Sequence, residues 1–549
     1  MLYGIQNCPT EWAYRSGKAY DDPFNEVTLD VVVTDPTGQQ HVVPTFWAGD
    51  QTWRVRYASP LVGQHRYVTE CSDPENRDLH GQEGVLEVTP YIGSNQLYKH
   101  GPLRVAADRR YLEHLDGTPF FWLGDTWWMS LCRRLSWPDE FRVMVADRVA
   151  KGFSVIQIVA GLYPDMPPFD ERGANEAGFP WQPDYGRINP AYFDAVDLRL
   201  AALLDAGLLP CLVGCWGYFV QWMGVERMKQ HWRYLIARYG AYPMVWCLAG
   251  EAMMPYYLSE DPEGDATTQR RAWTELAAYV RRVDPYHHPL TLHPTAPAST
   301  RDQVEGTALL DIDMLQTGHR DRESLAPTVE YVARAVATAP RLPVINGEVC
   351  YEGILEASRQ EIQRLMFWVC VLSGAAGHTY GANGIWQLNT RAQPFGPSPH
   401  GASWGNAPWE DAYRLPGSTQ VGLGKRLLER YPWWRFAPHQ DWVSPLDEAA
   451  GYARRPYAAG IPHDVRVVYF PCEAFWAWWR GGTGYTVTNL EADRAYRAFF
   501  FDPITGRELP LGTARGDETG AWRVLSPMVA QDWVLVLDQP TPATQGPRD

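Results

Sequence analysis

Two stretches of the sequence end in the same way: PMVWCLAGE at Pro243–Glu251 and PVINGE at Pro343–Glu348. Each is a short apolar run of the kind that forms a buried strand, and each stops on a Gly-Glu pair. In a parallel barrel the carboxyl ends of all strands meet at one face. If both runs are strands of one barrel, Glu251 and Glu348 therefore lie together at that face.

Six more apolar runs bring the predicted strands to eight. The predicted strands are Phe120–Trp127, Val155–Ala160, Leu208–Trp216, Met244–Ala249, Leu290–His293, Asp313–Thr317, Val344–Asn346 and Gly377–Gly381. Helical patterns fill the gaps between them, at Pro138–Lys151, Ala191–Ala206, Met228–Tyr239, Thr268–Val283, Thr328–Ala337, Glu361–Ser373 and Thr419–Tyr431. Strands that alternate with helices indicate βα units and a parallel sheet. We predict an α/β fold with a TIM (β/α)8 barrel over residues 96–437.

Both flanks of the barrel show a different pattern, in which short runs alternate apolar and polar residues between turn signals. On the N-terminal side these runs are Val27–Thr34, His41–Trp47, Thr52–Tyr57 and His65–Thr69. On the C-terminal side they are Val465–Phe470, Gly484–Asn489, Ala495–Phe501, Trp522–Leu525 and Asp532–Leu537, before a tail from Gln539. Period-two runs at this spacing predict antiparallel β-sandwich domains over residues 1–95 and 438–549.

The composition indicates which classes of molecule the protein can bind. A formal charge of −15 opposes binding to the phosphate backbone of nucleic acid, whereas 25 Trp and 29 Tyr supply rings that can stack on sugar faces. The longest apolar stretch, Leu365–Gly377, is shorter than the roughly 20 residues of a membrane helix. We expect a carbohydrate substrate and no nucleic-acid or membrane partner; a homo-oligomer is left open.

The beginning of the chain and its cysteines bear on the compartment. Residues 1–9 lack the pattern of a secretion signal, and nine cysteines, an odd number within apolar segments, favour thiols over a disulfide framework. The sequence therefore predicts a cytoplasmic location, although a signal removed earlier remains an alternative.

Glu251 and Glu348 are the predicted catalytic residues. A retaining glycosidase needs one carboxyl group to protonate the leaving oxygen and then activate water, and a second, about 5 Å away, to attack the anomeric carbon. The alternative is that each glutamate only marks where a strand reaches solvent. Because both follow Gly at the ends of the fourth and seventh predicted strands, we favour the catalytic interpretation.

Substrate-binding candidates lie at the same strand ends. They are Asp125, Trp127, Gln157, Trp216, Tyr218, His293, Gln316, His319, His378, Tyr380 and Trp386. Asp125 could instead cap the following helix, and the others could be hydrogen-bonded residues of a barrel core. A Tyr or His bonded to the nucleophile would hold its carboxylate ionised, but the sequence does not indicate which one does so. The long Pro-, Gly- and Trp-rich loop from Trp386 to Pro416 is expected at the same face.

No cofactor is expected. His287, His288 and His293, or Cys211 and Cys215, do not have the spacing of a zinc site. The sequence also lacks a phosphate-binding glycine loop, a Gly-x-Ser-x-Gly elbow and a dinucleotide fingerprint.

Several motifs resemble the apiosidase-like barrel glycosidases, which include glycoside hydrolase family 140 and belong to clan A. They are FFWLGDTWW at Phe120–Trp128, the Gly250-Glu251 and Gly347-Glu348 pairs, and GHTYGANGIW at Gly377–Trp386. The segment Glu11–Val88 is similar to a β-sandwich often found before such barrels, and Val465–Leu537 to a collagen-binding-like β domain that follows them.

The resemblance implies a retaining double displacement with Glu251 as acid/base and Glu348 as nucleophile. This chain departs from the pattern at position 250, where many clan A enzymes carry Asn and this one has Gly. A hydrogen bond to the substrate 2-hydroxyl must then come from elsewhere or be absent, which favours a furanose or an unusual pyranose; cleavage of a β-apioside is one option. A small, exo-cleaved glycoside is expected, and a transglycosidase or a non-catalytic carbohydrate-binding protein are the alternatives.

Overall fold

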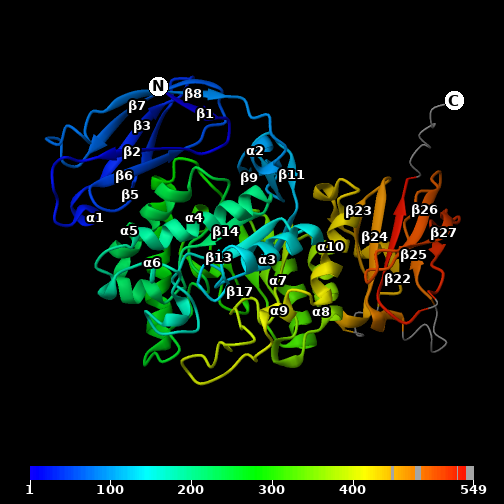
Figure 1. Ribbon diagram of the computed structural model, residues 1–549. Helices are drawn as coiled ribbons and strands as arrows, with labels where there is room; N and C mark the ends of the chain where they lie inside the picture. Colours follow the sequence, from blue (N-terminus) through cyan, green and yellow to red (C-terminus); the bar gives the residue numbers. More distant parts are fainter. Residues whose placement is uncertain (447–450, 476–483, 528, 540–549) are drawn as a thin grey trace.

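A computed structural model describes residues 1–446, 451–475, 484–527 and 529–539. Figure 1 shows a central barrel with one β unit at the N-terminal side and another at the C-terminal side. The predicted α/β class and the flanked TIM barrel are confirmed. The predicted tail from Gln539 lies, after that residue, outside the described part of the chain.

Eight parallel strands form the barrel. They are β12 (Trp122–Thr126), β13 (Val155–Val159), β14 (Leu209–Val213), β15 (Val245–Cys247), β16 (Leu290–Thr291), β18 (Asp313–Gln316), β19 (Val344–Glu348) and β20 (Gly377–Tyr380). β12 pairs with both β13 and β20, so the first and last strands lie side by side. All residues of these strands are buried, as expected where helices cover a parallel sheet.

The barrel is completed between β16 and β18 by a side chain. The short β17 (Ala298–Ser299) runs antiparallel to β18. Thr300 Oγ1 donates to Leu292 O at 2.6 Å and accepts from Met314 N at 2.9 Å, so it bridges the segments that follow β16 and form β18. The buried polar groups at this seam therefore have partners.

Helices surround the barrel in the predicted order. They are α3 (Asp139–Lys151), α4 (Pro190–Asp205), α5 (Phe219–Tyr239), α6 (Pro262–Val283), α7 (Leu325–Ala337), α8 (Gln360–Leu372), α9 (Trp409–Ala412) and α10 (Pro416–Leu428). Pro is the first residue of α4, α6 and α10. An N–H group at this position makes no hydrogen bond within the helix, so its absence in Pro costs nothing there. The short α1 (Pro23–Glu26) and α2 (Gln96–His100) lie before the barrel.

The N-terminal unit is a sandwich of two sheets. One has the order β1 (Leu2–Ile5), β8 (Glu83–Thr89), β7 (Gly63–Cys71), β3 (Leu29–Thr34) and β4 (Gln40–Pro44). The other has β2 (Thr10–Arg15), β6 (Thr52–Tyr57) and β5 (Phe46–Trp47). Val31 and Val33 of the first sheet pack against Val55 and Tyr57 of the second. The pairing is antiparallel except at one edge, where β1 runs parallel to β8.

A small three-stranded sheet connects this sandwich to the barrel. It consists of β9 (Leu103–Val105), β10 (Leu112–His114) and β11 (Pro119–Phe120) in antiparallel order. The sequence analysis predicted no separate sheet here, because strands of two or three residues are too short to show a period.

The described residues of the C-terminal unit form a six-stranded and a three-stranded sheet. The larger has the order β21 (Ala437–Pro438), β23 (Tyr457–Ile461), β24 (Val465–Phe470), β29 (Trp533–Asp538), β26 (Tyr496–Phe501) and β27 (Glu508–Ala514); the smaller has β22 (Val443–Ser444), β25 (Thr486–Val487) and β28 (Trp522–Arg523). One face of β24 packs into the sandwich core and the other against the barrel core. Both faces are therefore covered, which explains why all six residues of β24 are buried.

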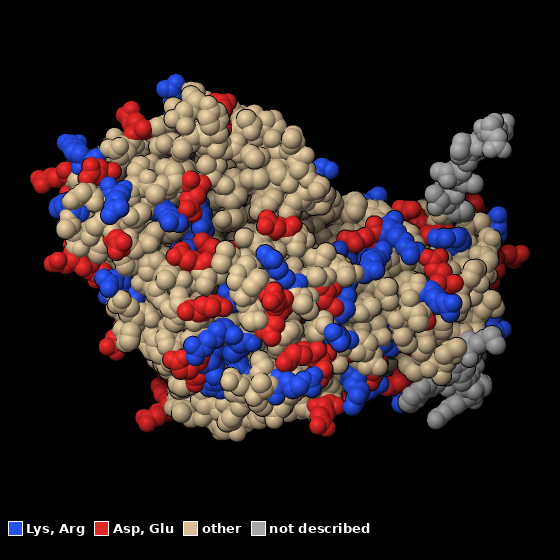
Figure 2. All heavy atoms as spheres, in the orientation of Figure 1, with Lys and Arg blue, Asp and Glu red and all other residues tan. Residues whose placement is uncertain are grey.

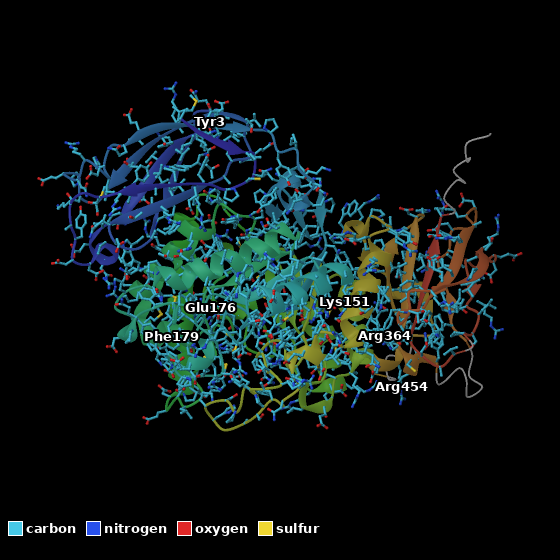
Figure 3. The ribbon with its side chains drawn as sticks, viewed as in Figure 1. Tyr3, Lys151, Glu176, Phe179, Arg364 and Arg454 are labelled. Carbon is cyan, nitrogen blue, oxygen red and sulfur yellow. The ribbon has the colours of Figure 1, made fainter. Side chains whose placement is uncertain are left out.

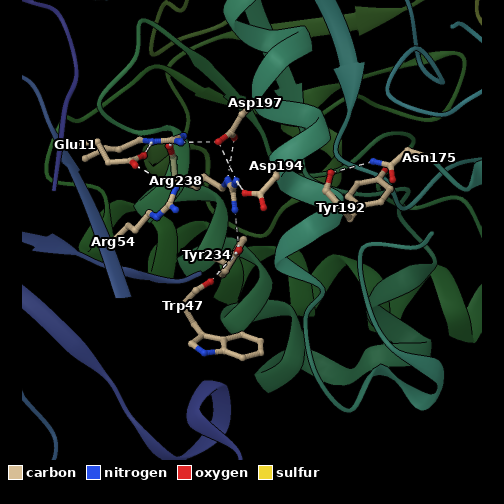
Figure 4. Close-up of polar contacts among 10 residues, drawn as sticks. Glu11, Trp47, Arg54, Asn175, Tyr192, Asp194, Asp197, Tyr234 and Arg238 are labelled. Atoms are coloured by element: carbon tan, nitrogen blue, oxygen red, sulfur yellow. Dashed lines mark hydrogen bonds and ion pairs between the residues drawn. The ribbon is translucent and has the colours of Figure 1, made fainter. Parts of the chain in front are cut away.

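Buried ion pairs attach the N-terminal sandwich to the barrel. Arg56 of β6 donates to Asp197 of α4 at 2.5 Å, and Asp197 also accepts from Arg238 of α5 at 2.8 and 2.9 Å. Figure 4 shows Asp194, Asp197, Tyr234 and Arg238 in this cluster, where the helices face the strands of the sandwich. Because Arg56 and Arg238 are buried, removing their shared partner should be costly.

A second buried ion pair attaches the C-terminal sheet. Arg364 of α8, labelled in Figure 3, donates to both carboxylate oxygens of Asp532 at 2.8 and 2.6 Å. Trp368 of the same helix stacks on Tyr469 of β24 with ring centres 6.0 Å apart. Both β units are thus packed against the barrel.

Acidic and basic side chains are intermixed on the face shown in Figure 2. Among the described residues, no helix combines the length and apolar character needed to cross a membrane.

Candidate active site

A cavity of about 350 Å³ opens at the carboxyl ends of the barrel strands. Glu251, four residues beyond β15, and Glu348, the last residue of β19, both line it. These are the fourth and seventh parallel strands of the barrel, so the structure brings together the two glutamates singled out by the sequence.

One side chain joins the two carboxyl groups. Gln316, at the end of β18, places its amide nitrogen 2.9 Å from Glu251 Oε1 and 2.9 Å from Glu348 Oε1. A side-chain amide carries two N–H donors, so it can serve both oxygens, and these can be no more than about 5.8 Å apart. The two glutamates therefore face each other across a single amide group.

Glu348 is buried and surrounded by nitrogen atoms. His319 Nε2 donates to Oε1 at 2.7 Å, and His293 Nε2 lies 3.2 Å from Oε2 in an orientation that makes no linear hydrogen bond. Burial by itself would raise the pKa of this carboxyl, but His293 and His319 outweigh it and hold the pKa below its ordinary value. Glu348 is therefore kept ionised.

Glu251 is in the opposite state. Burial, and secondarily the negative charge of Glu348, raise its pKa to about 7, whereas the bond from Gln316 lowers it less. Its backbone has a φ of 41°, in the left-handed region that non-glycine residues rarely adopt. Such strain is often found at functional sites. A carboxyl that titrates near neutral pH can both give and take a proton.

Gly250 is in close contact with Trp216. A Cβ atom at this position would lie 2.2 Å from the Trp216 ring, much closer than van der Waals contact permits. Trp216, which also lines the cavity, therefore occupies the space that a side chain at position 250 would need. Glycine at this position and tryptophan at 216 depend on each other.

A stack of rings forms one side of the cavity. His319 stacks on Tyr351 with centres 4.7 Å apart, and Tyr351 stacks on Trp386 at 5.8 Å. Trp128 donates its indole N–H to the Tyr351 hydroxyl at 3.0 Å. These faces suit the apolar face of a sugar ring, while the carboxylates and amide suit its hydroxyl groups.

The long loop after β20 covers another side of the cavity. Three of its residues, Trp386, His400 and Trp404, line the cavity. The loop is anchored to the segment after β13, because Ser398 donates to Asp165 at 2.7 Å and Arg172 donates to Phe395 O at 3.1 Å. Contacts between two loops therefore hold this side of the cavity in place.

The structure brings together eight of the thirteen residues singled out by the sequence. Glu251, Glu348, Trp216, Gln316, His319 and Trp386 line the cavity. His293 contacts Glu348, and Gln157 donates to the backbone oxygen of Gly347 at 3.0 Å, so these two contact the site without lining the cavity.

The other five lie outside the cavity. Asp125 accepts from Arg148 and Trp127, and Tyr380 donates to Glu352 at 2.6 Å. His378 packs against Phe367 of α8, and Tyr218 donates to Tyr163 O at 3.3 Å. Asp125, His378 and Tyr380 have side chains among the helices and loops outside the barrel, because alternate residues of a strand point to opposite faces.

Sequence reasoning missed several cavity residues. Trp128 is the last residue of the motif FFWLGDTWW but was not singled out, and Tyr351 stands three residues after Glu348. Asp165, Tyr257, His400 and Trp404 lie on loops, where no period marks a residue as facing a site. Only the composition of the loop from 386 to 416 indicated that it would be functional. Within the described ranges, no three His, Cys, Asp or Glu side chains are grouped to hold a metal ion.

Two family models match the sequence. The apiosidase-like catalytic domain matches residues 106–435, which is more than half of the chain, and a domain of unknown function (DUF5060) matches residues 8–72. No curated protein sequence matches this chain.

Solved structures of glycoside hydrolases share the fold. A glycoside hydrolase family 5 structure from Bacteroides vulgatus is 24% identical, with a TM-score of 0.65 over 80% of this chain and 94% of that one. Another glycoside hydrolase is 25% identical, with a TM-score of 0.62 over 80% and 97%. A proposed glycoside hydrolase, also from Bacteroides vulgatus, is 16% identical, with a TM-score of 0.69 over 98% and 100%. With the family model covering the whole barrel, this chain belongs to the apiosidase-like family.

Proposed function

We propose that the protein is a retaining, exo-acting glycoside hydrolase in which Glu251 is the acid/base and Glu348 the nucleophile. The observation that carries the proposal is the shared bond of Gln316 to both carboxyl groups, which limits their nearest oxygens to about 5.8 Å. Retaining enzymes hold their carboxyl groups about 5–5.5 Å apart, whereas inverting enzymes separate them by about 6.5–9.5 Å to admit a water molecule.

The opposite pKa shifts support the division of roles. In the first step the ionised Glu348 attacks the anomeric carbon, the glycosidic C–O bond breaks, and Glu251 gives its proton to the leaving oxygen. The pKa of about 7 leaves Glu251 largely protonated below neutral pH, so that proton is available. His293 and His319 keep Glu348 free of a proton that would block its attack.

In the second step the same two residues release the sugar. Glu251, now a carboxylate, takes a proton from water, and the resulting hydroxide attacks the anomeric carbon. The ester bond to Glu348 breaks and its carboxylate is restored. Two inversions at one carbon give net retention of configuration.

The enclosing loops support exo action on a small glycoside. The contacts of Ser398 with Asp165 and of Arg172 with Phe395 join two loops beside the cavity, which favours a pocket that accepts the end of a chain. A cavity of about 350 Å³ is at the small end of ligand sites, which are about 300–1,000 Å³. Because Trp216 blocks any side chain at 250, a sugar without a contact from that position is favoured, and β-apioside cleavage remains one option.

The test is hydrolysis of aryl pyranosides and furanosides of both anomers, including β-apiofuranosides, by the wild type and by Glu348→Gln. We expect one glycoside to be hydrolysed with retention, as followed by NMR of the first product, and Glu348→Gln to lose more than about 10³-fold in kcat. A 2-deoxy-2-fluoro derivative of the reactive sugar should label the peptide that contains Glu348. The unfolding temperature of each variant controls for loss of fold.

Other outcomes would overturn the proposal. An inverted first product would contradict the double displacement, and full activity of Glu348→Gln would contradict its role as nucleophile. A folded protein that binds sugars but hydrolyses none of them would favour the carbohydrate-binding alternative.

A further inference from the structure

A third carboxyl group, that of Asp165, lines the cavity without a direct cationic partner. Asp165 is only 3% exposed, and no Lys or Arg in the described chain lies within ion-pair distance of it. Ser398 donates to Oδ1 at 2.7 Å, and Tyr257 is a second hydrogen-bonding neighbour. A carboxylate has about four acceptor positions, so about two of them remain for a ligand.

Burial of this group has an energetic consequence. Burial raises the pKa of Asp165, and the bonds from Tyr257 and Ser398 offset only part of that rise. A buried carboxyl with unused acceptor positions is unfavourable unless something donates to it. A hydroxylated ligand would supply those donors, whereas an apolar ligand would close off the carboxyl and leave it less satisfied.

Asp165 lies on the Glu251 side of the cavity. Tyr257, beside Asp165, also experiences the charge of Glu251. Glu348 has different neighbours of its own, His293 and His319, whereas Gln316 bonds to both carboxyl groups. In the proposed mechanism Glu251 protonates the leaving oxygen, so the groups on its side surround the leaving group.

The same wall carries rings that suit a sugar. Tyr257 contacts His400 edge to face with ring centres 5.0 Å apart, and both line the cavity with Trp404. The Trp404 indole donates to Ser398 at 3.2 Å, and Ser398 in turn orients Asp165. Ring faces beside a fixed carboxylate form a site for a ring that has both an apolar face and hydroxyl groups.

We propose that Asp165 accepts hydrogen bonds from hydroxyl groups of the leaving group, so that the substrate is a disaccharide or oligosaccharide and not a glycoside of an apolar aglycone. The inference deepens the proposed function and rests on it.

The experiment compares two substrates that share the reacting sugar and differ in the leaving group. One is the aryl glycoside found with the panel above, and the other is a set of disaccharides of the same sugar. For Asp165→Asn we expect the ratio of kcat/KM for the best disaccharide to that for the aryl glycoside to fall about 10- to 100-fold, as for loss of charge-assisted hydrogen bonds. Inhibition by the free leaving sugar should weaken in parallel.

Two further variants separate recognition from loop structure. Asp170→Asn weakens the pair of Asp170 with Arg172, at 2.8 and 2.9 Å, on the same loop but outside the cavity. It should leave the substrate ratio unchanged, whatever it does to the overall rate. Ser398→Ala should lower the ratio in the same direction as Asp165→Asn but by less.

The outcomes distinguish this inference from the proposed function. An unchanged ratio in Asp165→Asn, or a wild type that hydrolyses aryl glycosides but no disaccharide, would overturn the inference and leave the proposed function standing. Full activity of Glu348→Gln, or a wild type inactive on every substrate, would overturn the proposed function and this inference with it.

Discussion

Replacing Glu348 by Gln should lower the pKa of Glu251. The substitution removes a negative charge whose nearest oxygen lies no more than about 5.8 Å from a Glu251 oxygen. At about 6 Å and an effective dielectric constant of about 20, two unit charges repel by about 2.8 kcal/mol, or about two pKa units. Because burial is the larger cause of the raised pKa of about 7, we expect the variant to retain a pKa between about 5 and 6.

The measurement must not depend on turnover, since the variant is expected to be inactive. Infrared difference spectra recorded across a pH series report the protonated carboxyl band directly. The band that belongs to Glu251 is identified by its absence in Glu251→Gln. Asp170→Asn serves as a control, because it neutralises a carboxyl outside the cavity and should leave the titration of Glu251 in place.

An unchanged pKa for Glu251 in Glu348→Gln would refute the reasoning. It would mean that the two carboxyl groups do not interact, and therefore that the Gln316 amide does not bond to both of them. A rise in the pKa would contradict the sign of the interaction itself.

Four other predictions concern stability and packing. Because the pKa of Glu251 is raised, its contribution to stability is complete below about pH 4.5 and is lost as the pH rises through about 7. Glu251→Gln should therefore raise the free energy of unfolding, measured in urea at pH 8, by up to about 3 kcal/mol. The same substitution should have little effect on that free energy at pH 4. Glu348→Gln should do the opposite at pH 8, since its lowered pKa makes its contribution present above about pH 4.5. Gly250→Ala should lower the free energy of unfolding by about 1–3 kcal/mol and reduce kcat/KM, because Trp216 must move. Gly347→Ala should lower the free energy of unfolding by less, because its new Cβ meets the flexible side chain of Met314. Equal effects of the two substitutions on stability and on kcat/KM would contradict the role of Trp216. Asp197→Ala should destabilise the protein by about 3 kcal/mol and separate the unfolding of the sandwich from that of the barrel in calorimetry. Asp194 is more exposed and bonds only Arg238, so Asp194→Ala should destabilise the protein less.

Much of the barrel could be predicted because its signals are local. A strand that is buried on both faces is a continuous apolar run, and a helix repeats its apolar positions within one or two turns. The runs that end at Glu251 and Glu348 show this signal, and both occur as strands of one parallel sheet. The short sheet of β9 to β11 gave no such signal, because two or three residues do not define a period.

The candidate site was only partly predictable, because position along a strand does not indicate which face a side chain occupies. Asp125 and Tyr380 lie at strand ends, as expected, but bond to Arg148 and Glu352 outside the barrel. Which face points inward depends on the tilt of the strands around the closed barrel, and no single strand encodes that.

The sequence by itself determined the class of fold, the order of its strands and helices, and the position of two glutamates at one face of the barrel. Each of these features follows from hydrophobic periodicity over a few residues. The tertiary structure alone decided that Gln316 joins the two carboxyl groups, that Trp216 fills the space beside Gly250, and that loops distant in sequence bring Asp165 to Ser398. Those contacts join residues tens to hundreds of positions apart, and their distances are set by how the closed barrel and its loops pack, which no local pattern records.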